Sequence, residues 1–174
     1  MDLAQHIRSI LDFPVPGINF RDITPLLENP TAFRYAVDQL VAATRSWGPV
    51  DLVAAPEARG FCFAIPVAMQ WNAGFVPIRK PGKLPYKTLS KSYALEYGMN
   101  TIQMHQDAIQ PGKRVLLVDD LLATGGTINA CRQLIEENGG ICVGAAFVME
   151  LAGLKGRHLL ETPNVAALVR YEGA

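Results

Sequence analysis

The sequence lacks several features that mark common classes of protein. It has only three cysteines in 174 residues, an odd number without metal-ligand spacing: Cys62, Cys131 and Cys142. A disulfide framework is therefore not expected. We expect the cysteines to be buried, reduced thiols. The three histidines stand far apart and next to no cysteine, which argues against a zinc site.

The sequence also has no long apolar run and no excess of either charge. Its longest uncharged apolar stretch, Ile141–Met149, is far shorter than the roughly 20 residues that span a bilayer. Sixteen Lys and Arg residues balance sixteen Asp and Glu residues, which disfavours nucleic acid or a membrane surface as a partner. The N-terminal residues contain no signal-type apolar run. We therefore expect a cytoplasmic protein whose residues 1–174 form a single domain.

Short apolar runs alternate with helical stretches along most of the chain. Apolar strands are predicted at 51–55, 74–78, 115–118, 141–148 and 165–169, and helices at about 2–11, 31–47, 61–71 and 127–137. Continuous apolar strands are typical of a sheet covered on both faces, and strands that alternate with helices run parallel. The pattern predicts an α/β fold with a mostly parallel central sheet flanked by helices.

Polar segments follow three of the predicted strands. They are PEARG (56–60), RKPGK (79–83) and DDLLATGGT (119–127). Ligands of open parallel sheets bind beyond the carboxyl ends of the strands. The three segments therefore predict a functional site at this edge of the sheet.

Two adjacent carboxylates, Asp119 and Asp120, follow the third of these strands. Taken alone, one could cap a turn while the other is solvated. The next segment, Ala123–Thr127, opens a helix with small residues. Its backbone N–H groups, the helix N-terminus and two threonine hydroxyls can surround an anion, without the lysine of a P-loop. A phosphate cradle beside acids that suit hydroxyls or hydrated Mg²⁺ predicts a ribose 5-phosphate site.

A basic segment runs from Arg79 to Lys91. It contains five basic residues and no acid: Arg79, Lys80, Lys83, Lys87 and Lys91. Three interpretations are open: a solvated loop, a nucleic-acid patch that has little aromatic interleaving, or a lid over a pyrophosphate. Pro81 and Gly82 break regular structure, so the charges are predicted to lie on a loop able to move.

The segment FPVPGINFRDITP (13–25) is rich in turn-forming residues. Either it is a simple N-terminal brace with Phe20 in the core, or it is a rigid turn. In the second case Phe20 is exposed and can stack on a flat ring.

These motifs together resemble a known family. VLLVDDLLATGGT (115–127) is similar to the phosphoribosyl-pyrophosphate (PRPP) signature of type I phosphoribosyltransferases. Four further segments, in the same order as in the family, resemble its adenine-specific members: FPVPGINFRDITPLL (13–27), EARGF (57–61), RKPGKLP (79–85) and SYALEYG (92–98). The resemblance covers essentially the whole chain.

The resemblance implies the reaction adenine plus PRPP giving AMP plus pyrophosphate, a purine-salvage reaction with Mg²⁺ bound together with PRPP. It also implies a homodimer, an N-terminal hood at about 1–30 and a mobile lid at about 79–103. Substrates would be small molecules, with no nucleic acid and no membrane as partners.

The resemblance also implies roles for residues at the phosphoribosyl end of the site. The 5-phosphate would be held by Ala123, Thr124, Gly125, Gly126 and Thr127. Asp119 and Asp120 would orient the ribose hydroxyls, and would reach Mg²⁺ only through water or those hydroxyls. The pyrophosphate would be bound by Ala58, Arg59, Arg79, Lys80, Lys83 and Tyr97, with Arg59 and Lys83 also acting in catalysis.

At the base, backbone groups of Asn19 and Arg21 would read adenine between Phe20 and Leu151. Family members often carry an aliphatic residue where this chain has Asn19, and a backbone contact is compatible with that change. Glu96, which alone would be taken for a solvated surface charge, becomes the candidate for proton transfer at the purine.

Two rival functions are weaker. One is a transferase of the same fold for xanthine, guanine or hypoxanthine, which the FRDIT segment disfavours and Asn19 leaves open. The other is a ligand-sensing regulator that kept the PRPP pocket. A regulator would be expected to have an added DNA-binding domain or a degraded lid, and this sequence has neither.

Overall fold

The computed structural model describes residues 1–94 and 98–173. In this part of the chain, five parallel strands form a central sheet in the order β4-β3-β7-β8-β9. Their bounds are Leu52–Pro56 (β3), Gly74–Ile78 (β4), Arg114–Leu122 (β7), Ile141–Leu151 (β8) and Val165–Tyr171 (β9). The predicted parallel α/β sheet is confirmed, with every expected strand present.

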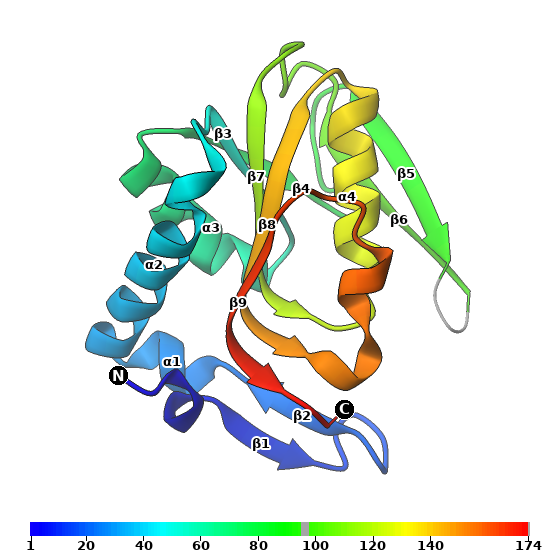
Figure 1. Cartoon of the computed structure of the whole chain (residues 1–174). Coiled ribbons are helices and arrows are strands. Elements are labelled where there is room, and N and C mark those ends of the chain that lie inside the picture. Colours follow the sequence, from blue (N-terminus) through cyan, green and yellow to red (C-terminus); the bar gives the residue numbers. More distant parts are fainter. Residues whose placement is uncertain (95–97, 174) are drawn as a thin grey trace.

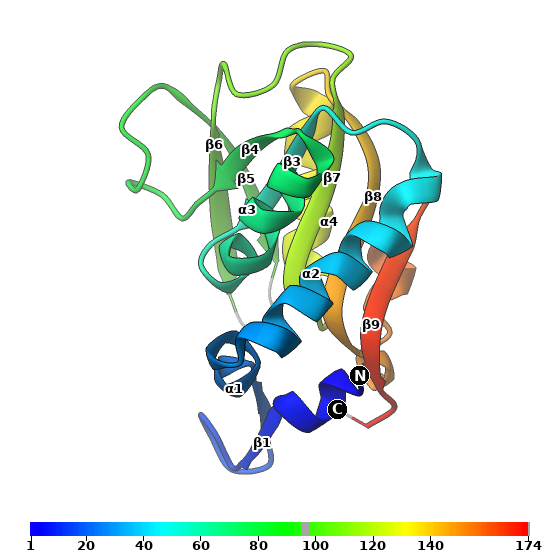
Figure 2. The ribbon, with the colours of Figure 1, turned by 90° about the vertical axis from the view of Figure 1, so that its left-hand side faces the viewer.

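Helices cover both faces of this sheet (Figure 1). One face carries α2 (Pro30–Thr44) and α3 (Arg59–Trp71), which Figure 2 shows in front of the strands. The other face carries α4 (Gly126–Glu137) and a hairpin of β5 (Thr88–Ala94) and β6 (Met99–His105). Shorter elements complete the described chain: α1 (Thr24–Glu28), η1 (Leu3–His6), η2 (Arg45–Trp47), η3 (Ala152–Leu154) and η4 (Gly156–Leu159).

The sequence explains where α2 and β7 form. Asn29 caps α2 by accepting hydrogen bonds from the backbone N–H groups of Thr31 and Ala32, and Pro30 fits the first helical position. The residues of α2 that face the sheet recur at helical spacing and are buried. β7 is buried on both faces from Val115 to Val118, as its continuous apolar run predicts.

β7 is longer than predicted and ends at Leu122. Asp119 and Asp120 therefore lie within the strand and not beyond it. Asp119 pairs with Phe147 of β8, so the parallel ladder continues through the first acid.

The predicted helix at 2–11 is wrong. Only a short 3₁₀ turn, η1, forms there, and Arg8–Leu11 is strand β1. β1 pairs antiparallel with β2 (Asn19–Asp22), in a two-stranded sheet that lies at the lower end of the molecule in Figure 1. Pairing with β2 satisfies the backbone of β1, and this long-range gain outweighs a weak local helical pattern.

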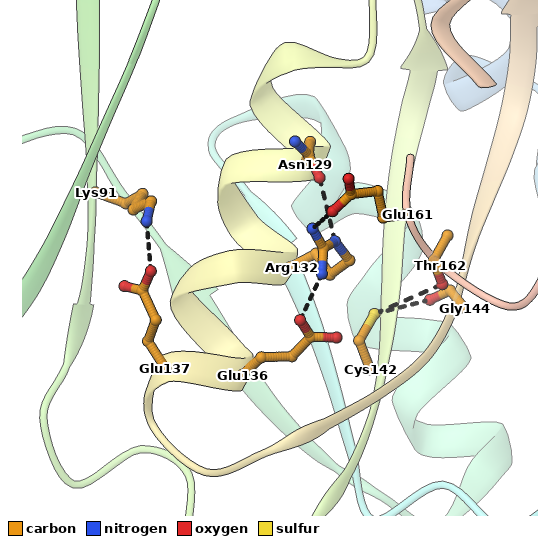
Figure 3. Close-up of polar contacts among 9 residues, drawn as sticks. All are labelled: Lys91, Asn129, Arg132, Glu136, Glu137, Cys142, Gly144, Glu161 and Thr162. Atoms are coloured by element: carbon orange, nitrogen blue, oxygen red, sulfur yellow. Dashed lines mark hydrogen bonds and ion pairs between the residues drawn. The ribbon is translucent and has the colours of Figure 1, made fainter. Parts of the chain in front are cut away.

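The loop predicted at 79–91 is correct for 80–87 and wrong for 88–91, because β5 begins at Thr88. Half-buried and exposed residues alternate along β5 from Leu89 to Ala94, and the strand packs against α4. Lys91 pairs with Glu137 at the end of α4 (Figure 3). This lysine is therefore tied to a helix and does not lie on the loop.

A buried arginine fixes α4 from the opposite side. Arg132 donates to Asn129 and Glu136 of the same helix and to Glu161 of the segment before β9 (Figure 3). Nearby, the Cys142 thiol contacts Thr162, and burial raises the pKa of this thiol.

None of the described helices is long and apolar enough to cross a bilayer.

Candidate active site

A cavity of about 200 Å³ opens at the carboxyl end of β7. It is lined by Arg59 and by every residue from Asp119 to Ile128. The acid pair, the first residue of α3 and the predicted phosphate cradle therefore share one cavity, although they are separated by about 60 positions in sequence.

The cradle is the turn between β7 and α4. Gly125 precedes the helix with φ of 85°, and no side chain caps the first turn of α4. The free N–H groups of that turn face the cavity end of the helix, where the helix dipole favours an anion. Thr124 and Thr127 lie on either side of the two glycines and line the cavity.

The two acids of β7 have different environments. Asp120 is 3% exposed, and its Oδ2 lies 2.9 Å from Nε of Arg59. The arginine N–H does not point at this oxygen, so Oδ2 accepts no hydrogen bond within residues 1–94 and 98–173. Asp119 keeps part of its surface exposed, but its Oδ1 is packed against Gly60 and accepts from the backbone N–H of Asp120 at 2.9 Å.

Both acids are harder to ionise than an ordinary aspartate. Burial, followed by the negative charge of Asp120, raises the pKa of Asp119 well above its usual value. Burial also raises the pKa of Asp120, although the charge of Arg59 opposes this effect. A cation or a set of hydroxyl donors in the cavity would favour the ionised pair.

Arg59 joins the acid pair to the N-terminal strands. Its guanidinium carbon lies 5.4 Å from the ring centre of Phe20 in β2. Its side chain is 41% exposed, so the two terminal nitrogens remain accessible while Nε faces Asp120. Ala58 directly precedes it at the start of α3, where no side chain caps the helix.

The basic segment is organised by Glu57, a residue of the EARGF motif to which the sequence assigned no role. Glu57 accepts from Arg79 Nε at 2.9 Å, from Arg79 Nη2 at 2.8 Å and from the backbone N–H of Lys80 at 2.7 Å. Burial opposes ionisation of Glu57, but these hydrogen bonds and charges outweigh it and lower the pKa. Arg79 is thus neutralised by Glu57, whereas Lys80 and Lys83 are exposed.

A second cavity of about 180 Å³ lies between this cluster and the β5–β6 hairpin. Thr127 lines both cavities, and its Oγ1 lies 3.0 Å from the Tyr93 hydroxyl. The Tyr93 ring also lies against Gly126. The hairpin is therefore hydrogen-bonded directly to the cradle, a contact that no sequence pattern predicts.

The N-terminal strands place Phe20 next to Arg59, which lines the cavity. Its ring packs edge-on against Phe13 at 5.2 Å, next to Arg59. Asn19 and Arg21 alternate with Phe20 along β2, and Arg21 stacks on Tyr171 at 4.0 Å. Their side chains therefore point away from Phe20.

Three further predicted residues have different outcomes. Leu151 is the last residue of β8 and lies at the carboxyl edge that also carries the acid pair. Glu96 and Tyr97 lie outside the described residues, so their predicted roles stay predictions.

Comparisons with known proteins identify the class first. The model of the phosphoribosyl transferase domain matches residues 26–163, and the chain belongs to that family. This match includes the acid pair, the cradle, Arg59 and the basic segment.

Individual relatives define the branch. The chain is 53% identical to the adenine phosphoribosyltransferase of Desulfitobacterium hafniense over 98% of each chain. The crystal structure of the Thermoanaerobacter pseudethanolicus enzyme of that name superposes with a TM-score of 0.94, at 48% identity, over 97% of this chain and 98% of the other. The Saccharomyces cerevisiae enzyme, solved with adenine and an imino-altritol bisphosphate, is 36% identical with a TM-score of 0.90, over 95% and 96%. Within the family, the chain therefore belongs with the adenine phosphoribosyltransferases.

Proposed function

We propose that the protein transfers the 5-phosphoribosyl group of PRPP to adenine and releases pyrophosphate, as the sequence predicts. The N9–C1′ bond forms, the bond from C1′ to the pyrophosphate oxygen breaks, and the N9 proton leaves. The observation that carries the proposal is the cavity lined by Arg59 and Asp119–Ile128. It combines an anion site at a helix N-terminus with two buried acids, and this combination suits a phosphorylated sugar.

The cradle Ala123–Thr127 anchors the 5-phosphate in this proposal. The free N–H groups of α4 and the hydroxyls of Thr124 and Thr127 are its donors. The phosphate lies away from the breaking bond, so its binding energy positions the reacting carbon and does not stabilise the leaving group directly.

The acid pair holds the ribose. Oδ2 of Asp120 is buried without a hydrogen-bond donor, and a ribose hydroxyl can supply one. Both carboxylates add negative potential beneath a ring that gains positive charge as the pyrophosphate departs. Their raised pKa values reflect charges that the bound substrate would compensate.

The cations act at the departing pyrophosphate. Arg59 offers its terminal nitrogens, Ala58 contributes backbone at the start of α3, and Lys80 and Lys83 approach from the loop. Arg79 keeps the pyrophosphate role that the resemblance implies. The ion pair of Arg79 with Glu57 has a second effect, because this pair holds the basic loop at the point where the loop begins.

The base binds at the N-terminal strands. Phe20 stacks on one face of adenine and Leu151 covers the other, while backbone groups of Asn19 and Arg21 read its edge. β2 belongs to a two-stranded sheet, so its outer edge has backbone groups free of any strand partner among the described residues. Glu96 would accept the purine proton and Tyr97 would bind the pyrophosphate, as the resemblance implies.

Mg²⁺ completes the proposal. The described residues contain no cluster of three or more His, Cys, Asp or Glu side chains that could hold a metal alone. Asp119 and Asp120 do fit an ion carried by the substrate, because Mg²⁺ keeps several waters and combines one or two carboxylates with substrate phosphates. When bound, Mg²⁺ would neutralise charge on the pyrophosphate.

The base specificity is tested by offering PRPP, Mg²⁺ and one base at a time: adenine, hypoxanthine, guanine, xanthine and orotate. Chromatography follows nucleotide formation. We expect AMP from adenine and no product from the other bases. Product from another base alone would contradict the assignment of the base wall, and no product with any base would favour the regulator.

Lys83→Ala tests the basic loop. Lys83 is exposed, and we expect kcat to fall by about 10- to 100-fold because one donor to the leaving group is lost. AMP affinity should stay nearly constant, since AMP carries no pyrophosphate. Lys113→Ala, at the opposite end of β7, is the matched control, and unchanged turnover in Lys83→Ala would remove the loop from the mechanism.

The proposal also includes a homodimer in the cytoplasm, where a highly charged substrate that does not cross membranes is retained. An apolar groove of about 540 Å³ between α2 and α3 supports a self-association surface. Met69 beside it is 77% exposed and Ile65 is 45% exposed.

Met69→Glu is expected to shift the protein from dimer to monomer, because it puts a charge into this apolar surface. Sedimentation equilibrium measures the shift. Met99→Glu, on the β5–β6 hairpin and 64% exposed, is the control. A monomeric parent protein would contradict the dimer, and a dimeric Met69→Glu variant would place the interface elsewhere.

A further inference from the structure

An ion pair between a buried carboxylate and a partly exposed guanidinium lies behind the phosphate cradle. Glu150 of β8 is 3% exposed, and Arg157 of η4 binds it through two parallel contacts, Nε to Oε1 at 2.7 Å and Nη2 to Oε2 at 2.8 Å. The remaining nitrogen, Nη1, donates to the Val165 carbonyl at 3.0 Å. One guanidinium therefore fixes η4 to β8 and β9 with the geometric specificity of a bidentate pair.

The turn held by this pair touches the cradle backbone. A Cβ atom built on Gly156 would lie only 2.1 Å from the Ala123 carbonyl oxygen. A Cβ atom on Gly125 would lie 2.5 Å from the Gly156 carbonyl oxygen. The two backbones are thus in direct contact, with no room for a side chain between them. Figure 1 shows this turn beside the lower end of α4.

The same segment ends at the base site. Leu151 follows Glu150 directly, and the chain then passes through η3 to Gly156 and Arg157. The ion pair therefore closes a loop that has the base-facing residue near one end and the cradle contact near the other. Removing Arg157 would leave the buried Glu150 carboxylate without its cation, so the ion pair favours one position of the loop.

We propose that Glu150, Arg157 and Gly156 are positioning residues that hold the phosphate cradle in its binding geometry. The inference rests on the proposed function, because it assigns the cradle to the 5-phosphate. These residues do not line the cavity. They act through the backbone of Ala123 and Gly125, and none of them belongs to the 115–127 motif.

Gly156→Ala is the direct test. The added methyl group has to displace the cradle, so we expect the Kd for ribose 5-phosphate and the KM for PRPP to rise by about tenfold or more. The affinity for Mg²⁺-pyrophosphate, which probes the other end of the site, should change less than twofold. Titration calorimetry measures both ligands without catalysis. Gly173→Ala, where a Cβ meets nothing within 4 Å, is the control.

Arg157→Lys keeps the inference testable if the glycine variant does not fold. Lysine keeps the charge but cannot make the parallel pair, so a smaller rise in KM for PRPP is expected, with kcat nearly unchanged. Arg170→Lys alters an exposed surface pair and serves as its control. Parent-like ribose 5-phosphate affinity in a folded Gly156→Ala or Arg157→Lys variant would overturn the positioning role. A parent protein that binds no ribose 5-phosphate would instead overturn the proposed function.

Discussion

Asp119→Asn is expected to leave a protein that melts at a higher temperature and is nearly inactive. The folded protein raises the pKa of Asp119, chiefly through burial and then through the charge of Asp120. A raised pKa means that ionised Asp119 costs folding free energy. Asparagine keeps the oxygen that accepts from the Asp120 N–H and removes the charge, so the cost disappears.

The sign of this effect predicts its pH dependence. The contribution of Asp119 to the free energy of unfolding is fully present below the pKa that this carboxyl has in the unfolded state. It is lost as the pH rises through the raised pKa that the carboxyl has in the folded protein. Asp119→Asn should therefore gain most over the parent protein at neutral and higher pH, and should match it in acid. Each kcal/mol by which the substitution increases the free energy of unfolding raises Tm by about 2–4 °C for a chain of this size.

In the proposed site, the same substitution removes the charge of one of the two carboxylates beneath the ribose. We expect kcat/KM for PRPP to fall by about 100-fold or more, in line with the loss of one preorganised electrostatic group. Calorimetric melting across pH and initial-rate kinetics measure the two effects. Asp107→Asn, at an exposed position, should alter neither. Full activity in Asp119→Asn would remove the ribose and Mg²⁺ role of the acid pair.

Arg59→Met is expected to produce the second large loss, a fall in kcat/KM of about 100- to 1000-fold. Nε of Arg59 lies beside Asp120 and its planar head lies near Phe20. Its terminal nitrogens are the groups proposed to bind the pyrophosphate. Methionine fills a similar volume but supplies none of these contacts. It also leaves the buried Asp120 without its cation, so the pKa of Asp120 should rise further.

Two more variants separate these contributions. Arg59→Lys restores the charge but has a single nitrogen, which cannot pair with Asp120 and meet the pyrophosphate in the same geometry, so we expect only partial recovery. Arg59→Met combined with Asp120→Asn should recover stability but no activity, because it removes the unpaired charge. Arg45→Met, whose parent side chain stacks on Trp71 away from the cavity, is the control. Turnover retained in Arg59→Met would contradict a role at the leaving group.

The sequence predicts the central sheet well, and it predicts the N-terminal segment and the β5 strand less well. The short continuous apolar runs at β3, β4, β7 and β8 predict strands, because a strand covered on both faces carries apolar residues at successive positions. The N-terminal helix fails because Arg8–Leu11 gains its stability from β2, a partner that a local pattern does not reveal. The β5 strand is missed because its exposed face carries two serines and its half-buried face includes Lys91, so the segment resembles a basic loop.

In the candidate site, too, groups that are close in sequence are predicted and contacts between distant elements are not. The acid pair and the cradle are contiguous in sequence, and one motif therefore places them together. The contacts of Glu57 with Arg79, of Tyr93 with Thr127 and of Glu150 with Arg157 join separate elements, and no sequence spacing predicts them. In the glutamate pairs a buried or partly buried carboxylate requires a cation, but the sequence does not say which one.

The strands β1 and β2 have a consequence for how such an enzyme diversifies. They supply Phe20 and the proposed contacts to the base edge, whereas Arg59 and Asp119–Ile128 line the cavity proposed for the phosphate and ribose. If these assignments hold, most of the base contacts and the sugar site are encoded in separate stretches of the gene. Mutations in the first stretch would then alter the choice of nucleobase and leave the sugar site intact. Residues 8–22 would form a segment to exchange when a transferase for a different base is designed.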